Sequence, residues 1–231
     1  MKIVSIHQPN YLPWLGYFYK IDQSDVFVFL DDVQYSTQGM HNFHYIKLAQ
    51  GPFRLKIPVE QKMGDLINQV RTRDELGWKN NHLKTIEHTY KKTPFFEEIY
   101  TDFSQLLQVD YPNIAEMNQA IIEFTCRKFG ITTEFVKSSE LKINTTREEK
   151  VLDICNALDA TVYYSGTGAK AYQVEENFTN RGLELRYSHY NPFEYPQFFE
   201  GFQSNITVLD FLMHCGYDWV RVNNSQILKY E

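Results

Sequence analysis

The sequence contains little cysteine and no excess of basic residues. Three cysteines occur among 231 residues, Cys126, Cys155 and Cys215, and no two of them have CxxC spacing. This pattern argues against disulfides and thiolate zinc sites, so we expect buried, reduced thiols. Lys and Arg number 23 against 29 Asp and Glu, giving a formal net charge of −6 without a basic cluster. We therefore expect no nucleic-acid partner.

Long apolar runs and motifs for covalent catalysis are also missing. No window approaches the ~20 consecutive apolar residues of a membrane-spanning helix, and the first residues do not resemble a secretory signal. No GxSxG motif is present, and no cysteine lies in the local sequence of a known nucleophile. We expect a cytoplasmic protein without a transmembrane segment, and covalent catalysis is not indicated.

Apolar and aromatic residues are abundant, at 43% and 16% of the chain, which is enough for a substantial core. Residues 3–6 and 26–30 are apolar strand candidates, and residues 13–23 between them predict a helix. Near-continuous apolar strands joined through a helix are typical of a parallel sheet with both faces covered. The sequence therefore predicts an α/β fold with a parallel, Rossmann-like, three-layer sheet core.

The remaining elements are predicted from periodicity and turn residues. Residues 53–59 alternate like a half-exposed strand that extends the sheet or packs at its edge. Two overlapping capping boxes at Thr145 and Thr146 predict the start of a helix. Further strands are expected at 161–164 and 183–187, and further helices from residue 80 to Pro94, at 112–129, at 169–180 and, last in the chain, at 206–215. No repeat or linker divides the chain, so we expect one domain, residues 1–231, with a helical section at about residues 80–130.

Candidate chemistry lies where the first two strands end. His7 follows the first strand, and Asp31 and Asp32 follow the second. The carboxyl ends of parallel strands meet at one edge of a sheet, so we expect these three side chains to share a crevice. An imidazole beside carboxylates supplies a general base near neutral pH, and paired carboxylates hold a divalent ion such as magnesium. The alternative is that the two aspartates cap a turn.

Other histidines carry weaker signals. His41 and His44 have HxxH spacing, but without a third ligand nearby this is a weak zinc signal. The alternatives are that Asn42 and His44 contact a polar ligand or that they are solvated. His82 and His88 are six residues apart and do not share a helical face, so we expect both at the surface.

Two later segments have both a structural and a functional interpretation. The turn at residues 165–168, Ser-Gly-Thr-Gly, joins a strand to a helix start, where backbone N–H groups attract anions. A simple tight connection is the alternative, because the full phosphate-binding motifs are absent. Residues 195–197 and 205–216 are aromatic and apolar, and we expect them in the core.

Both ends of the chain resemble one known family, the WbqC-like proteins. The family's opening signature resembles HQPNYLPWLGYF at residues 7–18, SDV at 24–26 and DDVQ at 31–34. Its closing motifs resemble YSG at 164–166, YPQ at 195–197, LD at 209–210 and CG at 215–216. The resemblance therefore runs over nearly the whole length.

WbqC-like proteins are bacterial and are often encoded with O-antigen and other surface-polysaccharide genes. The activity proposed for them is transfer of glycine or a similar acyl group onto a glycan. The resemblance implies a transferase of lipopolysaccharide or related biosynthesis. Combined with the candidate residues at the strand ends, it gives our leading hypothesis, in which His7 is a general base or phosphate contact and Asp31 with Asp32 orients it or holds magnesium. The side chains expected to bind substrate are Gln8, Asn10, Tyr11, Trp14, Gln34, Asn42, Lys47, Arg54, Lys56, Ser165 and Gly166.

Residues 40–47 depart from the family's pattern, in which an Arg-Asn-Arg-like cluster precedes an Ile-Lys pair. Asn42 and Lys47 are kept, but the arginines are not. If those arginines hold a phosphate in relatives, this protein binds its ligand more weakly, binds something less charged, or uses Arg54 and Lys56 instead.

Two other functions stay open. The strand-turn-helix opening is similar to that of nucleotidylyltransferases, which predicts nucleotide binding with magnesium. Alternatively, the protein binds a nucleotide sugar, or other polysaccharide-assembly enzymes, without catalysis. The small-molecule substrate expected for the transferase is an activated amino acid or a nucleotide sugar.

Overall fold

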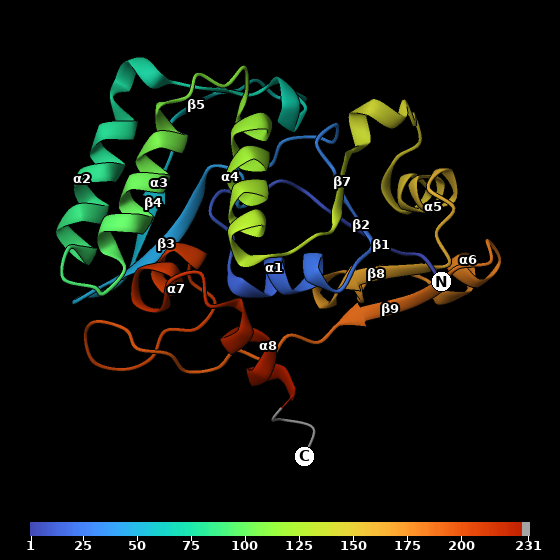
Figure 1. Ribbon diagram of the computed structural model, residues 1–231. Helices are drawn as coiled ribbons and strands as arrows, with labels where there is room; N and C mark the ends of the chain where they lie inside the picture. The colour runs from blue at the N-terminus through green and yellow to red at the C-terminus, as the bar shows by residue number, and fades with distance from the viewer. Residues whose placement is uncertain (228–231) are drawn as a thin grey trace.

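The computed structural model describes residues 1–227, and a five-stranded parallel sheet lies at its centre (Figure 1). From one edge to the other the strands are β7 (Glu134–Lys137), β2 (Val26–Phe29), β1 (Ile3–His7), β8 (Val162–Gly166) and β9 (Glu184–Ser188). In chain order these are the third, second, first, fourth and fifth strands of the sheet, which is the order of a Rossmann-like fold. The predicted parallel α/β core is confirmed.

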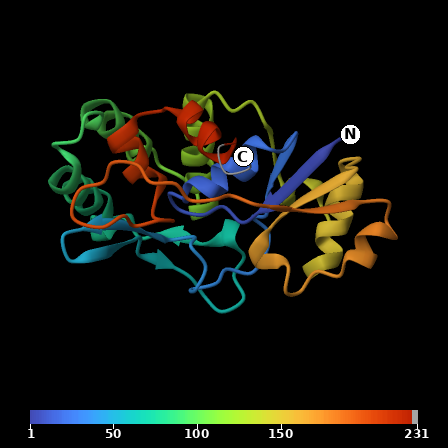
Figure 2. The ribbon, with the colours of Figure 1, turned by 90° about the horizontal axis from the view of Figure 1, so that it is seen from below.

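Helices cover both faces of the sheet, because successive side chains of a strand point to opposite sides. Phe27 and Phe29 of β2 pack in one apolar cluster with α1 (Leu15–Asp22) and α4 (Ile114–Phe129). Val26 and Val28 pack in a second cluster with residues of α5 (Arg147–Ala157) and α6 (Glu175–Thr179). The view from below shows α1 and α5 on opposite sides of the sheet (Figure 2).

The chain between β2 and β7 forms a separate group of elements beside the sheet. Three helices stand side by side over two small hairpins (Figure 1). The helices are α2 (Trp78–Tyr90), α3 (Phe96–Gln108) and α4, and the hairpins are β3 (Phe43–Leu48) with β4 (Gly51–Lys56) and β5 (Val59–Glu60) with β6 (Arg71–Thr72). Single 3₁₀ turns complete the group at Ile67–Gln69 and Asp74–Leu76.

The last part of the chain returns to this group. After β9 a long segment without regular structure crosses the molecule toward the β3–β4 hairpin and leads to α7 (Val208–Cys215), which is followed by α8 (Trp219–Ile227) (Figures 1 and 2). Short 3₁₀ helices follow β7 and β8 at Ser138–Leu141 and Thr167–Ala169. None of the helices in residues 1–227 is long and apolar enough to span a membrane.

Several predicted elements are wrong. A strand is present within the predicted residues 53–59, but it neither extends the parallel sheet nor pairs at its edge, because β4 pairs antiparallel with β3 in a separate sheet. The sequence analysis missed β3. The helix expected at 169–180 is limited to α6: Tyr172 and Val174 are 73% and 53% exposed, so this segment has no buried apolar face that would stabilise a longer helix. The helix ending at Cys215 is not the last, since α8 follows it.

The predicted end of one helix is confirmed, and the predicted capping of another is wrong. Gly130 ends α4 in the left-handed conformation, with φ +77°, as expected for a glycine that follows a helix. At the start of α5, however, the Thr146 side chain forms no capping hydrogen bond, and the Thr145 hydroxyl donates to Asp153 at 2.7 Å. The predicted capping boxes are therefore wrong, although α5 itself is present.

Candidate active site at the carboxyl edge of the sheet

The sheet opens at the position where its strand order reverses, between β1 and β8. These strands pair only through Ile3 with Val162 and Val4 with Tyr163, whereas β1 stays paired with β2 as far as His7 and Phe29. The carboxyl half of β1 is therefore separated from β8. Ligands of Rossmann-like sheets bind outside the carboxyl ends of the strands at this switch point.

Lys20 of α1 reaches the opening between β1 and β8. The carbonyls of Ile3 and His7 accept hydrogen bonds from the β2 side, so the carbonyl of Ile6 faces β8. No β8 residue pairs with Ile6; the Lys20 amine donates to its carbonyl at 3.0 Å instead. Lys20 is 3% exposed, and burial lowers its pKa to about 7. Sequence analysis missed this residue, although a lysine between buried helix residues was a usable signal.

His7 lies at the carboxyl end of β1 and is held in one tautomer. Its Nδ1 atom is 2.9 Å from the carbonyl oxygen of Gln8, which can only accept, so Nδ1 carries the proton and Nε2 has the lone pair. The ring contacts Tyr17 edge-on, with centroids 4.8 Å apart. Burial and, next, the charge of Lys20 lower the pKa of His7 to about 3. The imidazole is therefore neutral at physiological pH.

Hydrogen bonds and burial hold the residues that follow His7 in place. The Gln8 carbonyl also accepts from the Tyr17 hydroxyl at 3.0 Å, and Asn10 is buried. Tyr11 is fully buried, and its hydroxyl lies 3.0 Å from Nδ1 of His82. The prediction of a surface position for His82 is wrong, because this ring packs under the opening motif.

The Trp14 indole lies between the imidazoles of two other sequence candidates. Its ring centroid is 6.3 Å from that of His7 and 6.4 Å from that of His44, over which it stacks. His41, Asn42 and His44 are all buried, so the interpretation of Asn42 and His44 as solvated loop residues is wrong. Among residues 1–227 no group of three or more His, Cys, Asp and Glu is placed to hold a metal ion.

Asp31 and Asp32 connect β2 to the segment that follows β7. Asp31 accepts hydrogen bonds from the Ser138 hydroxyl at 3.1 Å and from the Ser139 amide and hydroxyl at 3.0 and 2.8 Å. Asp32 accepts from Ser138 at 2.5 Å and from the Lys150 amine at 2.8 Å. No contact between either carboxylate and His7 is found in the described residues.

This donor set does not fit a magnesium ion. Lys150 is 5% exposed and already neutralises Asp32, and its ammonium would repel a divalent cation. The remaining oxygen positions on Asp31 and Asp32 are bound to serine donors. The arrangement corresponds to the turn-stabilising alternative, and we derive no step through a metal.

Ser165 and Gly166 end β8 on the other side of the opening. Ser165 is 1% exposed, and its hydroxyl lies 3.4 Å from the carbonyl of Gly166. Because β8 is parallel to β1, these residues lie at the same edge of the sheet as His7. Their role in ligand binding stays a prediction.

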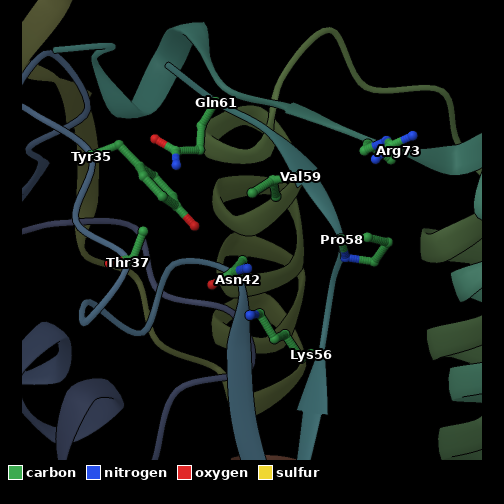
Figure 3. A pocket seen from close by; sticks show the side chains of 8 residues that line it. All are labelled: Tyr35, Thr37, Asn42, Lys56, Pro58, Val59, Gln61 and Arg73. Atoms are coloured by element: carbon green, nitrogen blue, oxygen red, sulfur yellow. The ribbon is translucent and has the colours of Figure 1, made fainter. Parts of the chain in front are cut away.

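A pocket of about 450 Å³ lies beside the β3–β4 hairpin, and we call it the hairpin pocket. Its apolar wall is formed by Pro58 and Val59. The Tyr35 ring lies across the pocket from this wall, and Arg73 lies beyond Pro58 (Figure 3). The polar side chains that line it are Tyr35, Thr37, Asn42, Lys56, Gln61 and Arg73.

Local pairing fixes the walls of the hairpin pocket. The side-chain amide of Asn42 donates to the backbone carbonyl of Ile57 at 2.8 Å. The backbone amide of Ile57 donates to the backbone carbonyl of Asn42 at 2.7 Å. Tyr35 is held by its backbone amide, which donates to the backbone carbonyl of Asp65 at 2.9 Å, and neighbouring Gln34 forms a β-bridge with Leu66. Of the sequence candidates, the pocket contains Asn42 and Lys56, whereas the side chain of Gln34 is exposed. Sequence analysis missed the others because they come from separate segments.

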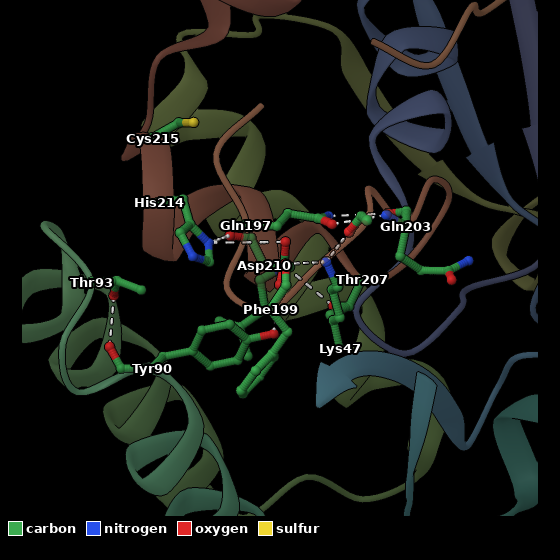
Figure 4. A network of polar contacts seen from close by, with 12 residues as sticks. Lys47, Tyr90, Thr93, Gln197, Phe199, Gln203, Thr207, Asp210, His214 and Cys215 are labelled. Carbon is green, nitrogen blue, oxygen red and sulfur yellow. Dashed lines mark hydrogen bonds and ion pairs between the residues drawn. The ribbon is translucent and has the colours of Figure 1, made fainter. Parts of the chain in front are cut away.

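Lys47 and Arg54 of the same hairpin have other contacts. The Lys47 amine donates to the backbone carbonyls of Phe199, at 3.1 Å, and of Gly201. It thereby holds the segment between β9 and α7 against β3 (Figure 4). The Arg54 guanidinium stacks on the Phe43 ring, 3.6 Å from its centroid.

The motifs near the end of the chain form a buried polar network around Asp210 of α7 (Figure 4). The Tyr90 hydroxyl donates to the Asp210 carboxylate at 2.9 Å, and His214 donates from Nδ1 to the Asp210 carbonyl at 2.9 Å. Burial raises the pKa of Asp210. Gln197 exchanges two hydrogen bonds with the backbone of Gln203, at 2.9 and 3.0 Å. These contacts anchor the terminal segment to the helical group.

Comparison with known proteins identifies a relative and a family that match nearly the whole chain. The chain is 30% identical over 220 residues to an uncharacterized protein of Mycobacterium tuberculosis strain H37Rv, Rv1507c, covering 94% of this chain and 95% of that protein. No solved structure matches the chain. The model of the WbqC-like protein family matches residues 8–222. With nearly its whole length matched, the chain belongs to the WbqC-like protein family.

Proposed function

We propose that this protein is a cytoplasmic transferase of bacterial surface-polysaccharide biosynthesis, which moves glycine or a similar acyl group from an activated donor onto a nucleotide-linked sugar. The observation that carries the proposal is the His7 ring at the sheet's switch point, with its proton held on Nδ1 by the Gln8 carbonyl at 2.9 Å. An imidazole fixed in this tautomer offers the lone pair of Nε2 to a reacting group. The three free, buried thiols fit a reducing compartment.

In the proposed step, an amine or hydroxyl of the sugar attacks the carbonyl carbon of the activated acyl group. A C–N or C–O bond forms while Nε2 of His7 accepts the proton from the attacking atom. The bond between the acyl carbon and the leaving group then breaks, and the electron pair departs with that group. His7 returns the proton to the leaving group, so the enzyme ends in its starting state.

The low pKa of His7 sets a requirement on the substrate. Burial and the positive charge of Lys20 hold this pKa at about 3, so proton transfer to His7 in the empty site is unfavourable. Negative charge beside Lys20 offsets this effect and stabilises the imidazolium that forms. The oxygen of the attacked carbonyl develops such charge as the new C–N or C–O bond forms.

Nucleotidylyl transfer is not our proposal, because it depends on magnesium. Asp31 and Asp32, the paired carboxylates at this edge, are bound to two serines and to Lys150. The alternative is that the protein binds a nucleotide sugar, or other polysaccharide-assembly enzymes, without catalysis. The experiment below distinguishes this binding protein from the transferase.

The test is an assay by mass spectrometry with nucleotide sugars as acceptors and acetyl-coenzyme A, glycyl-coenzyme A or glycyl-adenylate as donors. We expect a nucleotide sugar with the added acyl mass, and we expect His7→Ala to lower its rate by about 100-fold or more. The control is His88→Ala, which removes an exposed histidine of α2. Undiminished product with His7→Ala would contradict the catalytic role; nucleotide-sugar binding without product from any donor would favour the binding protein.

A further inference from the structure

We propose that the hairpin pocket binds the diphosphate of a nucleotide substrate. The identity of the group attached to the diphosphate rests on the proposed function, whereas the diphosphate site itself rests on the pocket. The pocket volume of about 450 Å³ lies within the range of small-molecule sites, about 300–1,000 Å³.

The charge of the pocket is opposite to that of the whole chain. The protein has a formal net charge of −6, but Lys56 and Arg73 line the pocket and none of its eight lining residues is acidic. Arg54 lies two residues before Lys56 on β4, but its guanidinium stacks on the Phe43 ring and does not line the pocket. The two lining cations, Lys56 and Arg73, favour a ligand with more than one negative charge.

These cations are available to a ligand. Lys56 forms no ion pair with a described residue. Arg73 pairs only with Glu75, at 2.9 Å, and both side chains are about half exposed or more, at 49% and 63%. Exposed pairs of this kind contribute little energy, so a phosphate can compete for Arg73.

Neutral polar groups in the pocket suit the part of a nucleotide next to its phosphates. Thr37 and Gln61 line the pocket, and the Tyr35 ring lies across from Pro58 and Val59 (Figure 3). Hydroxyl and amide side chains hydrogen-bond ribose and base edges, while a flat apolar wall suits an aromatic base. The lining therefore fits a nucleoside diphosphate better than an isolated inorganic anion.

The rings of Tyr35 and His41 pack against each other behind the hairpin pocket, with their planes tilted by 47°. Their centroids are 5.3 Å apart. His41 is 0% exposed, so these rings form a packed contact between the pocket and the interior of the protein.

Two substrates of the proposed reaction carry this diphosphate: the acceptor nucleotide sugar and coenzyme A, if the donor is a thioester. Isothermal titration calorimetry of the full chain with inorganic pyrophosphate, UDP, UDP-N-acetylglucosamine and coenzyme A tests the site. We expect UDP or coenzyme A to bind more tightly than pyrophosphate, and the tighter of the two identifies the source of the diphosphate. Binding should weaken as salt concentration rises, because the contacts are ionic.

Single Lys56→Gln and Arg73→Gln variants should each weaken binding of the best nucleotide by about tenfold, and the double variant by more. Lys92→Gln is the matched control, since Lys92 is an exposed lysine just beyond α2 and should leave affinity unchanged. Affinity as in the wild type for the double variant, or no binding of any of the four probes to the wild-type protein, would overturn the diphosphate site.

Failure of this site and failure of the transferase proposal give different results. Loss of nucleotide binding in the Lys56 and Arg73 variants, without any transferred acyl group in the wild type, supports the diphosphate site and contradicts the transferase. Acyl transfer that is sensitive to His7→Ala but insensitive to Lys56→Gln and Arg73→Gln supports the transferase and contradicts the site. His7→Ala should bind UDP as tightly as the wild type, because His7 does not line the pocket.

Discussion

Lys20 lowers the basicity of His7 from a position inside the opened sheet. Its amine donates to the carbonyl of Ile6, the residue before His7, at 3.0 Å, and its charge is the largest contribution after burial to the depressed pKa of His7. The two side chains therefore form one electrostatic unit at the switch point. A ligand that brings negative charge to this place alters both.

Replacing Lys20 with methionine should raise the pKa of His7, because the positive charge that disfavours the imidazolium is removed. Titration of the His7 ring protons by NMR measures this change. Lys92→Met, a change far along the chain beyond α2, serves as the control. An unchanged His7 pKa in Lys20→Met would show that the coupling between the two groups is absent.

The stability of the fold should fall as pH decreases below 6.5. His41, His44 and His82 are 0%, 1% and 5% exposed, and burial lowers the pKa of each from 6.5 to about 4. Between these values the unfolded chain binds more protons, so the stabilising contribution is complete above pH 6.5 and is lost as pH falls toward 4. The loss is at most about 1.4 kcal/mol per histidine and pH unit.

Urea unfolding at pH 7.5, 6 and 5 measures this dependence. His82→Gln should reduce the slope of unfolding free energy against pH, because one of the three buried imidazoles is removed. His88→Gln, which changes an exposed histidine of the same helix, should leave the slope as it is. Equal slopes for the wild type and His82→Gln would contradict the assignment.

The sheet could be predicted from the sequence because its signals are local. The apolar runs of β1 and β2 and the helix between them lie within the first 30 residues. The β3–β4 hairpin could not be found in the same way, because β3 includes His44 and Lys47, whose burial depends on contacts with distant parts of the chain. That residues 1–231 form one domain stays a prediction, which limited proteolysis can test.

In the candidate site, too, the sequence analysis found residues with local signals and missed contacts between distant segments. His7 was found because it ends a strand, but the partners of Asp31 and Asp32 are 107 and 118 residues away, at Ser138 and Lys150. Neither Ser138 nor Lys150 lies in a sequence motif that would have indicated a contact with the aspartates. The cation Arg73 of the hairpin pocket also comes from a different segment than Tyr35, so only the folded chain brings them to one cavity.

The ion pair of Asp32 and Lys150 should be important for stability. The side chains are 17% and 6% exposed, and the nitrogen and oxygen are 2.8 Å apart. Lys150→Met leaves a poorly solvated carboxylate without its partner, which should cost about 3–5 kcal/mol of unfolding free energy. Asp32→Asn in the Lys150→Met background should restore part of this loss, since the unpaired charge is then removed.

Chemical denaturation of the two variants measures both effects. The matched control is Arg186→Met, which breaks the exposed pair with Glu184 and should leave the unfolding midpoint unchanged. If Lys150→Met were as stable as the wild type, Asp32 would be free for other partners. The argument against magnesium at this carboxylate would then fail.

A structural role and a substrate-binding role of Lys47 predict different experimental results. It is 5% exposed, and its amine donates to the carbonyls of Phe199 and Gly201 in the segment that leads to α7. Lys47→Met should leave these carbonyls without a donor, so amide hydrogen exchange in residues 197–203 should accelerate by about tenfold. Exchange in β1 should not change, because that strand keeps its hydrogen bonds.

The family resemblance makes the opposite prediction for Lys47, namely that it binds substrate. In that case Lys47→Met would abolish nucleotide binding, while exchange in residues 197–203 would stay at the wild-type rate. Measuring hydrogen exchange and UDP affinity on the same variant separates the two roles. We expect faster exchange with unchanged affinity, because Lys47 lies in the Asp210 network and not among the residues that line the hairpin pocket.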